Sequence, residues 1–79
     1  MKYNKNELKV LKKYGELAFL NPEVKTDLDL YTYIFVKIMF EHPLLDGNKR
    51  LACKYLLSNL GVREDIIENI CHFLAKEIR

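Results

Sequence analysis

The stretch Leu28–Phe40, LDLYTYIFVKIMF, is the most apolar part of this chain of 79 residues, and its only charged residues are Asp29 and Lys37. Apolar residues would occupy nearly every face of a helix here, which indicates a central helix covered by neighbours on several sides. The β-branched and aromatic residues also suit a strand, but strands usually run only about 5 to 6 residues. We therefore predict a helix that begins near Thr26 and runs to about Glu41.

The same stretch falls short of the roughly 20 apolar residues that span a bilayer. The polar start of the chain, MKYNKNELK, lacks the apolar segment of a secretory signal. The two cysteines, Cys53 and Cys71, are far apart and lack C-x-x-C spacing, which favours reduced thiols over a disulfide framework. These features predict a cytoplasmic protein with no membrane segment.

A helical pattern precedes the central stretch. In NKNE, Asn4 stands three residues before Glu7, which is typical of a capping box at a helix start. This first helix should end before Pro22, because the residue before a proline is pushed away from helical angles. Gly15 inside it predicts a bend or a pause, since glycine costs about 1 kcal/mol in a helix interior relative to alanine.

Two more helical patterns follow the central stretch. The segment KRLACKYLLSNLG predicts a third helix that stops at Gly61. Acidic residues Glu64 and Asp65 then begin a last helix with one apolar stripe. The stripe consists of Ile66, Ile67, Ile70, Cys71, Leu74 and Ile78. The expected fold is all-α, a small bundle of about four helices in a single domain over residues 1–79.

The composition is that of a soluble globular protein, with 49% hydrophobic and 30% charged residues. A net charge of +2, with lysines and arginines scattered along the chain, gives no indication of a nucleic-acid partner. The oligomeric state stays open at this level, a homodimer included.

The connection between the second and third helices, EHPLLDGNKR (Glu41–Arg50), places several functional groups in one bend. Lys49 and Arg50 stand at a helix start, where the macrodipole already presents partial positive charge and disfavours cations. Their position makes sense if the backbone N–H groups of the first turn, the flexible Gly47 and the two cations converge on an anion. Phosphate is the anion that we expect.

Two further groups in this bend fit chemistry on a phosphate. Asp46 can supply an oxygen to a Mg²⁺ ion that also takes phosphate oxygens and waters. Histidine side chains commonly act as general bases near neutral pH, and His42 can take a proton from an incoming hydroxyl group in that role. Together these groups predict phosphoryl or nucleotidyl transfer.

Each residue of the bend also has a simpler structural interpretation. Asp46 and Gly47 form a turn in many proteins, Asn48 can cap a helix, and Pro43 can end one. The combination is what favours a functional site over a structural loop. By contrast, His72 beside Cys71, with Cys53 elsewhere, lacks a fourth metal ligand, and we expect these three residues to pack in or near the core.

The motif HPLLDGNKR resembles that of the Fic/Doc (Fido) family, and specifically its Doc (death-on-curing) branch. The general Fic pattern is H-P-F-x-[DE]-G-N-G-R-x-x-R, whereas the Doc branch reads H-x-F-x-[DN]-[AG]-N-K-R. Lys49 stands where most Fic proteins have glycine, so the motif has the Doc form. The resemblance extends from about Leu28 to the C-terminus, because family members place the motif between two buried helices and follow it with a helix that ends in an N-G turn.

The resemblance implies a Fic/Doc-like core that uses ATP and Mg²⁺. By this resemblance His42 is the base that activates the hydroxyl group, and Asp46 is a Mg²⁺ ligand. Gly47, Asn48 and Arg50 bind the phosphates. Lys49 corresponds to the lysine that accompanies a changed nucleotide pose, in which the γ-phosphate rather than AMP is transferred. It further implies a toxin kinase that modifies a serine or threonine of a protein such as elongation factor Tu and is silenced by a separate antitoxin protein.

Three departures from the family pattern keep other functions open. Leu44 replaces the family's phenylalanine but is still apolar and able to anchor the loop in the core. Cys53 replaces the second arginine of the AMP-transferring pattern, which weakens the alternative of AMP transfer. Only Glu23–Thr26 could serve as the β-hairpin flap that usually precedes the motif and pairs with the target. A truncated, non-catalytic interaction protein is therefore the second hypothesis.

Overall fold

The computed structural model describes residues 2–77, and within that range it contains four helices and no strand. The helices are α1 (Lys5–Leu20), α2 (Asp27–Glu41), α3 (Asn48–Asn59) and α4 (Glu64–Lys76). This confirms the predicted all-α bundle. None of these helices combines the length and the hydropathy that crossing a membrane requires. Ile78, which was predicted to extend the stripe of the last helix, lies outside the described residues.

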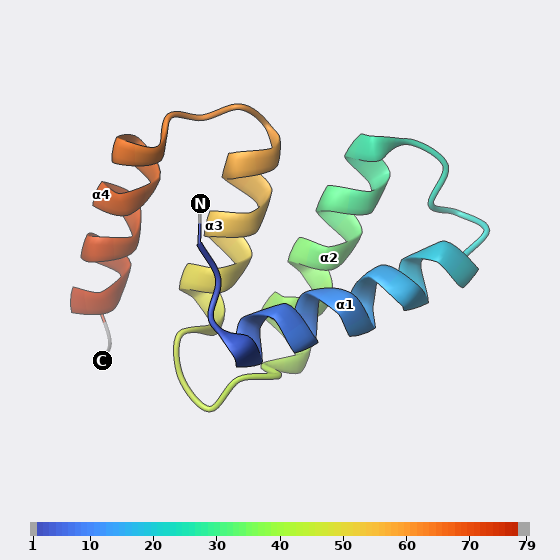
Figure 1. Ribbon diagram of the computed structural model, residues 1–79, viewed down its shortest axis with the longest axis horizontal. Coiled ribbons are helices and arrows are strands. Elements are labelled where there is room, and N and C mark those ends of the chain that lie inside the picture. The colour runs from blue at the N-terminus through green and yellow to red at the C-terminus, as the bar shows by residue number, and fades with distance from the viewer. Residues whose placement is uncertain (1, 78–79) are drawn as a thin grey trace.

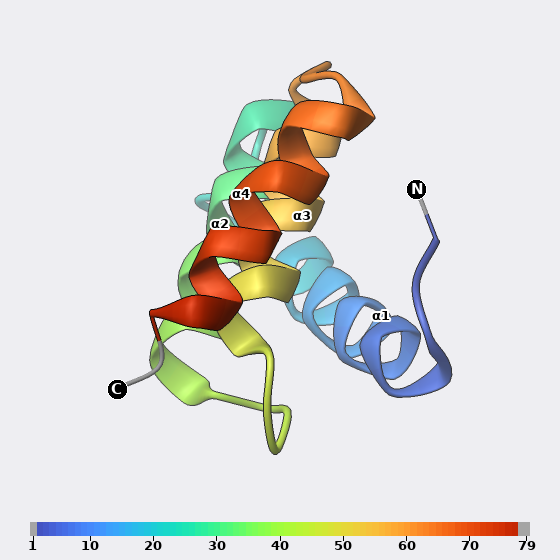
Figure 2. The ribbon, with the colours of Figure 1, turned by 90° about the vertical axis from the view of Figure 1, so that its left-hand side faces the viewer.

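The helices α2, α3 and α4 lie side by side in that order, and α1 crosses α2 (Figure 1). Turned by 90°, the structure shows α1 on one side of this layer and no described helix on the other (Figure 2). Helix α2 therefore packs against α1 and α3, whereas α4 packs mainly on α3. The loop of residues 42–47, which carries most of the HPLLDGNKR motif, joins the lower ends of α2 and α3 in Figure 1.

Reciprocal capping boxes begin the first two helices, and the sequence predicted the one between Asn4 and Glu7. The Asn4 side chain accepts from the Glu7 N–H at 2.8 Å, and the Glu7 carboxylate accepts from the Asn4 N–H at 2.9 Å. Thr26 and Asp29 form the same pair at α2. The N–H groups of Lys25 and Thr26 lower the pKa of the Asp29 carboxyl, because they hydrogen-bond to its charged form.

The sequence predicted a bend or a pause at Gly15, and no pause occurs there, because α1 is continuous from Lys5 to Leu20. The capping box at its start and the packing of its apolar face outweigh the cost of a single glycine of about 1 kcal/mol. Val10 and Tyr14 of α1 are buried against the other helices.

The core forms where α1, α2 and α3 meet. Its buried cluster consists of Val10, Tyr14, Ile34, Ile38, Leu51 and Ala52. Ile38 and Leu51 are fully buried, so the C-terminal half of α2 and the first turn of α3 are held close together. The core therefore lies directly behind the loop that joins these two helices.

The prediction that α2 is covered on several sides is wrong for its outer face. Ile34 and Ile38 face the core, whereas Leu28, Val36 and Phe40 are exposed. The physical reason is the small number of helices. Helices α1 and α3 cover one side of α2, and α4 packs mainly on α3, so no described helix covers the outer face of α2.

The apolar stripe of α4 is only partly buried. Ile67 is buried and Cys71 is half-buried, but Ile66 and Ile70 are exposed. Burial raises the pKa of the Cys71 thiol. It also raises the pKa of the Cys53 thiol, to which the nearby Cys71 adds a smaller increase. Both cysteines are free and stay protonated near neutral pH, which fits the expected packing role.

One buried hydroxyl connects α1 to the end of α2. Tyr14 is 1% exposed, and its hydroxyl donates to Glu41 Oε1 at 2.8 Å. Burial and this hydrogen bond raise the pKa of Tyr14 to about 12. Lys37 pairs with the same carboxylate, and the hydrogen bonds from Lys37 and Tyr14 lower the pKa of Glu41. The residue before His42 is thereby fixed to α1.

Replacing Tyr14 with phenylalanine should lower the free energy of unfolding by about 1 to 2 kcal/mol, because a hydrogen bond to a charged, partly buried acceptor is lost. Chemical denaturation measures this. Tyr31→Phe is the control, since its hydroxyl makes no hydrogen bond among residues 2–77, and it should change stability by less than about 0.5 kcal/mol. Equal losses in the two variants would contradict the role of the Tyr14–Glu41 bond.

Candidate functional site

The loop between α2 and α3 begins and ends with a left-handed residue. His42 ends α2 with φ 50° and ψ 58°, while its N–H still donates to the Ile38 carbonyl at 3.1 Å. Gly47 precedes α3 with φ 83°. Pro43 has no N–H with which to continue the helix, so the chain must leave α2 at His42. The His42 side chain is exposed at this corner.

The Asn48 side chain holds the loop in shape. Its Oδ1 accepts from the Leu44 N–H at 2.7 Å, and its Nδ2 donates to the Leu44 carbonyl at 2.8 Å. Leu44 itself packs against the core cluster, which confirms that this smaller residue can anchor the loop. Asn48 is the first residue of α3, and its side chain does not cap that helix. Its amide positions the loop instead.

The start of α3 has the features of an anion site. The residue at the cap position is Gly47, and no side chain among residues 2–77 caps this terminus. The first-turn N–H groups therefore point outward without a helical acceptor. No acidic residue stands in this first turn, whereas Lys49 and Arg50 do. Charge and backbone donors thus favour an anion at the same place.

Asp46 lies beside the cationic group of Arg50. The distance between Asp46 Oδ2 and Arg50 Nη2 is 3.4 Å, and the Asp46 side chain is largely exposed whereas that of Arg50 is partly buried. A Cβ atom on Gly47 would lie 3.0 Å from Arg50 Nη2. The glycine thus has two functions, because it permits the left-handed turn and leaves space for the guanidinium group.

All six sequence-predicted site residues line one cavity of about 290 Å³. These are His42, Asp46, Gly47, Asn48, Lys49 and Arg50. The C-terminal part of α4 supplies another wall with Leu74, Ala75 and Glu77. The motif residues are therefore close together in space as well as in sequence, and we call this space the motif cavity.

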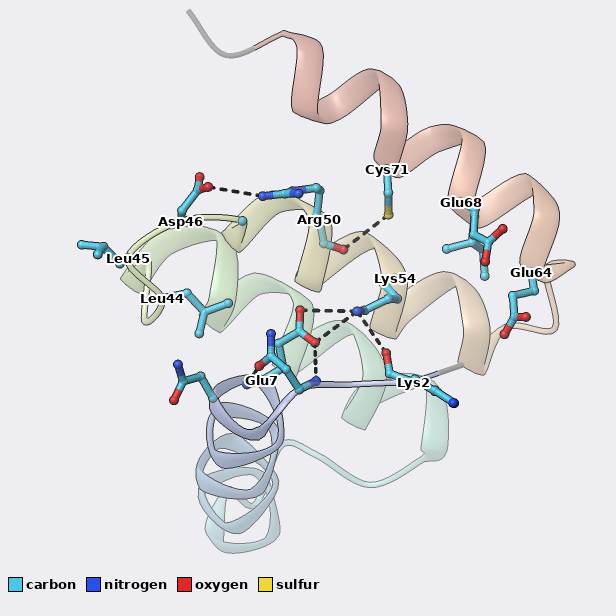
Figure 3. Close-up of a pocket in the computed structure, with 14 residues that line it drawn as sticks. Lys2, Glu7, Leu44, Leu45, Asp46, Arg50, Lys54, Glu64, Glu68 and Cys71 are labelled. Atoms are coloured by element: carbon cyan, nitrogen blue, oxygen red, sulfur yellow. Dashed lines mark hydrogen bonds and ion pairs between the residues drawn. The ribbon is translucent and has the colours of Figure 1, made fainter.

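A larger cavity of about 740 Å³ adjoins the motif cavity, and Figure 3 shows the residues that line it. Leu45, Asp46, Gly47 and Arg50 line both spaces. The start of α1 and one side of α4 complete the larger one.

An ion pair inside this larger cavity was not predicted. Lys54 Nζ lies 3.2 Å from Glu7 Oε1, and both side chains are mostly buried. Lys54 also lies over the Tyr3 ring, 4.8 Å from its centroid. The partners are 47 residues apart, so no local pattern could have revealed the pair. The sequence indicated only the capping role for Glu7 and no particular role for Lys54.

The described residues contain no cluster of three or more histidine, cysteine or acidic side chains that could hold a metal by itself. The expected packing of His72 and Cys71 in or near the core is wrong for His72, which is exposed because α4 packs mainly on α3 and leaves its outer side uncovered, whereas Cys71 is partly buried. Asp46 supplies one carboxylate to the motif cavity, beside the uncapped start of α3. That donor set fits Mg²⁺, which commonly binds through one or two carboxylates together with substrate phosphates and waters.

The proposed role of Glu23–Thr26 as a flap is wrong. This connection precedes α2, whereas His42 follows it, so the two lie at opposite ends of the helix (Figure 1). A helix of 15 residues is about 22 Å long. The connection contains a turn and no strand. It cannot hold a target segment beside the motif cavity.

The chain was compared with protein-family models, with curated proteins and with solved structures, and none of them matches it.

Gly47→Ala should destabilise the protein by about 1 to 2 kcal/mol, because alanine is strained at φ 83° and its Cβ would crowd Arg50. Gly15→Ala is the matched control, since that glycine lies inside α1 and nothing lies within 4 Å of its Cβ position. The control should stabilise the protein by about 0.5 to 1 kcal/mol. Denaturant unfolding of both variants tests these opposite signs, and a shared sign would contradict this account of the loop.

Asn48→Ala should remove both hydrogen bonds to Leu44 and lower the free energy of unfolding by about 1 to 3 kcal/mol. Hydrogen exchange of the Leu44 amide should accelerate in parallel, because that N–H loses its acceptor. The control is Asn59→Ala, which removes one exposed bond to the Tyr55 carbonyl at the end of α3. If Leu44 exchanges at the same rate in all three proteins, Asn48 does not hold the loop.

Proposed function

We propose that this protein is a Doc-like kinase that transfers the γ-phosphate of Mg²⁺·ATP to a serine or threonine hydroxyl of another protein. The observation that carries the proposal is the motif cavity, because a base, a carboxylate and an uncapped, cationic helix start line the same space.

The start of α3 is the proposed phosphate site. Its first-turn N–H groups donate to phosphate oxygens, and Lys49 and Arg50 neutralise their charge. Bound Mg²⁺ would neutralise charge on the transferring phosphoryl group, and Asp46 is the residue that would hold it. Asp46 and Arg50 are only 3.4 Å apart, so they can bind the metal and a phosphate oxygen side by side.

His42 is the proposed general base. Its position after the last turn of α2 exposes the imidazole at the edge of the cavity. In the proposed reaction the substrate oxygen attacks the γ-phosphorus, its proton moves to a ring nitrogen of His42, and ADP leaves with the electrons of the broken P–O bond. The products are a phosphorylated protein and ADP, and His42 then loses its proton to solvent.

The larger cavity is the proposed location of the nucleoside. Its volume of about 740 Å³ lies within the usual range of roughly 300 to 1,000 Å³ for small-molecule pockets, whereas the motif cavity alone is smaller. Glu7 and Glu68 line it, and carboxylates disfavour phosphate but accept hydrogen bonds from ribose hydroxyls. Only the phosphate chain would then enter the motif cavity.

Lys49 and Cys53 favour phosphate transfer over the neighbouring alternative, transfer of AMP. Lys49 gives the motif its Doc form, and the half-buried Cys53 stands where the AMP-transferring pattern has an arginine. The wider proposal is a cytoplasmic toxin that acts on a protein such as elongation factor Tu and is inhibited by a separate antitoxin protein.

A second candidate function is a non-catalytic helical interaction protein. It is favoured by large apolar side chains on the surface, such as Phe19, Phe40 and Leu45, which are each more than 80% exposed. The position of Glu23–Thr26 far from the motif cavity also favours it, because no described segment then holds a target there.

The function can be tested by incubating the purified protein and a cell extract with Mg²⁺ and ATP that carries the label on either the γ- or the α-phosphate. We expect label on a protein from γ-ATP only, and a decrease of at least about 100-fold in His42→Ala. His72→Ala is the matched control, because His72 is exposed on α4 and lines neither cavity.

The other outcomes of this experiment are also informative. Label on a protein from α-ATP alone would show that the protein transfers AMP and is not a kinase. If neither label is transferred, the proposal that the protein is an enzyme is contradicted. Calorimetric titration with Mg²⁺·ATP would then decide whether the nucleotide binds. If the nucleotide binds and its affinity falls in Asp46→Ala and Arg50→Ala, the motif cavity is a phosphate-binding site that does not catalyse transfer. If there is no binding, the interaction protein is the better explanation.

A further inference from the structure

Helix α4 carries an exposed apolar stripe that the rest of the described chain does not cover. Ile66, Ile70 and Phe73 follow one another at spacings of four and three residues and are 42%, 36% and 57% exposed. Residues at this spacing lie on one face of a helix. The adjacent face of α4, which includes Ile67, packs on α3. A shallow apolar hollow of about 290 Å³ lies along the stripe at Ile70, Phe73 and Leu74.

The accessible surface is larger than the mass of the chain requires. It amounts to 5817 Å², whereas a folded monomer of 9.4 kDa exposes about 5,000 Å². The excess is on the order of 800 Å², which is about the area that each partner contributes to a standard protein interface. Figure 2 shows no described helix on the side of the α2–α3–α4 layer opposite to α1.

The charges beside the stripe suit a second, antiparallel copy of α4. Asp65 lies at the N-terminal end of the helix, where it also pairs with Arg63 at 3.1 Å, and Lys76 lies at the C-terminal end; all three are exposed. An antiparallel copy brings Asp65 of one chain beside Lys76 of the other, twice in one interface. The two helix dipoles are then opposed as well, which is favourable. A parallel copy would place like charges together.

We propose that the protein forms a homodimer in which the α4 helices of two chains pack antiparallel across a two-fold axis near Ile70. Such an interface is isologous, so one self-complementary patch covers itself. Ile70 packs on Ile70 of the second chain, and Ile66 packs on Phe73 of the second chain. The apolar stripe of each chain is buried by the other, with the Asp65–Lys76 pairs at the rim.

The exposed face of α2 is the main competing surface. Leu28, Val36 and Phe40 lie there, but Thr32 stands between Leu28 and Val36 and hydrogen-bonds to the backbone of its own helix. The apolar positions are thus interrupted, and no acidic and basic residues at opposite ends of this face would match an antiparallel copy. The α4 stripe is the more regular interface.

The dimer does not depend on the proposed kinase activity, but it would border the motif cavity. Leu74 and Glu77 line both that cavity and the hollow along the stripe. A second chain on the stripe would therefore form part of the rim of the motif cavity while leaving the motif residues in place.

The test is sedimentation equilibrium of the purified full chain over a range of concentrations. The wild type should sediment with twice the chain mass of 9.4 kDa. Phe73→Glu should raise the dimer dissociation constant by at least about 30-fold, the effect of removing a central interface anchor. Phe19→Glu is the matched control, because Phe19 is 89% exposed on α1, and it should leave the dimer unchanged. Circular dichroism checks that both variants remain helical.

Charge reversal provides a second test that spares the apolar residues. Lys76→Glu should weaken the dimer, because it places a carboxylate beside Asp65 of the second chain, and circular dichroism checks that α4 remains helical. A wild type that stays monomeric at all concentrations would overturn the proposal. So would a dimer that is broken by Phe40→Glu but not by Phe73→Glu, since the interface would then lie on α2.

Discussion

The two hydrogen bonds between the Asn48 amide and the backbone of Leu44 are the constraint on which the rest of the site depends. They connect the first residue of α3 to the middle of the loop, and they leave the bend between the left-handed residues His42 and Gly47 little freedom. Because Leu44 also packs on the core, the loop is fixed from both sides. The base, the carboxylate and the cationic helix start can therefore share one cavity without being buried.

The same loop is connected to the stability of the whole bundle through α1. Tyr14 donates to Glu41, the residue directly before His42, so α1 covers the core and also positions the end of α2. Glu7 and Lys54 connect α1 to α3 in a similar way on the other side of the loop. In a chain this small, the contacts that stabilise the fold and those that shape the two cavities are largely the same.

Helix α4 contributes to two different surfaces. Its C-terminal part lines the motif cavity, while its exposed stripe has no cover in the described chain. A bundle in which α4 packs mainly on one neighbour cannot bury both apolar faces of that helix. The proposed dimer would resolve this without any rearrangement of the core, and the proposed interaction protein would use the same kind of surface for another partner.

The helices could be predicted from local sequence, because capping residues such as Asn4 and Thr26 act on their own neighbours and apolar periodicity is local. The sequence also determined that His42, Asp46 and Arg50 would share a site, since they stand within one short loop. It was wrong about the cover of α2 and the flap, and it missed Glu7 with Lys54 and the part of α4 beside the motif. Those features depend on which helices pack together, and only the tertiary structure decides that, because contacts between residues far apart in the chain leave no local pattern.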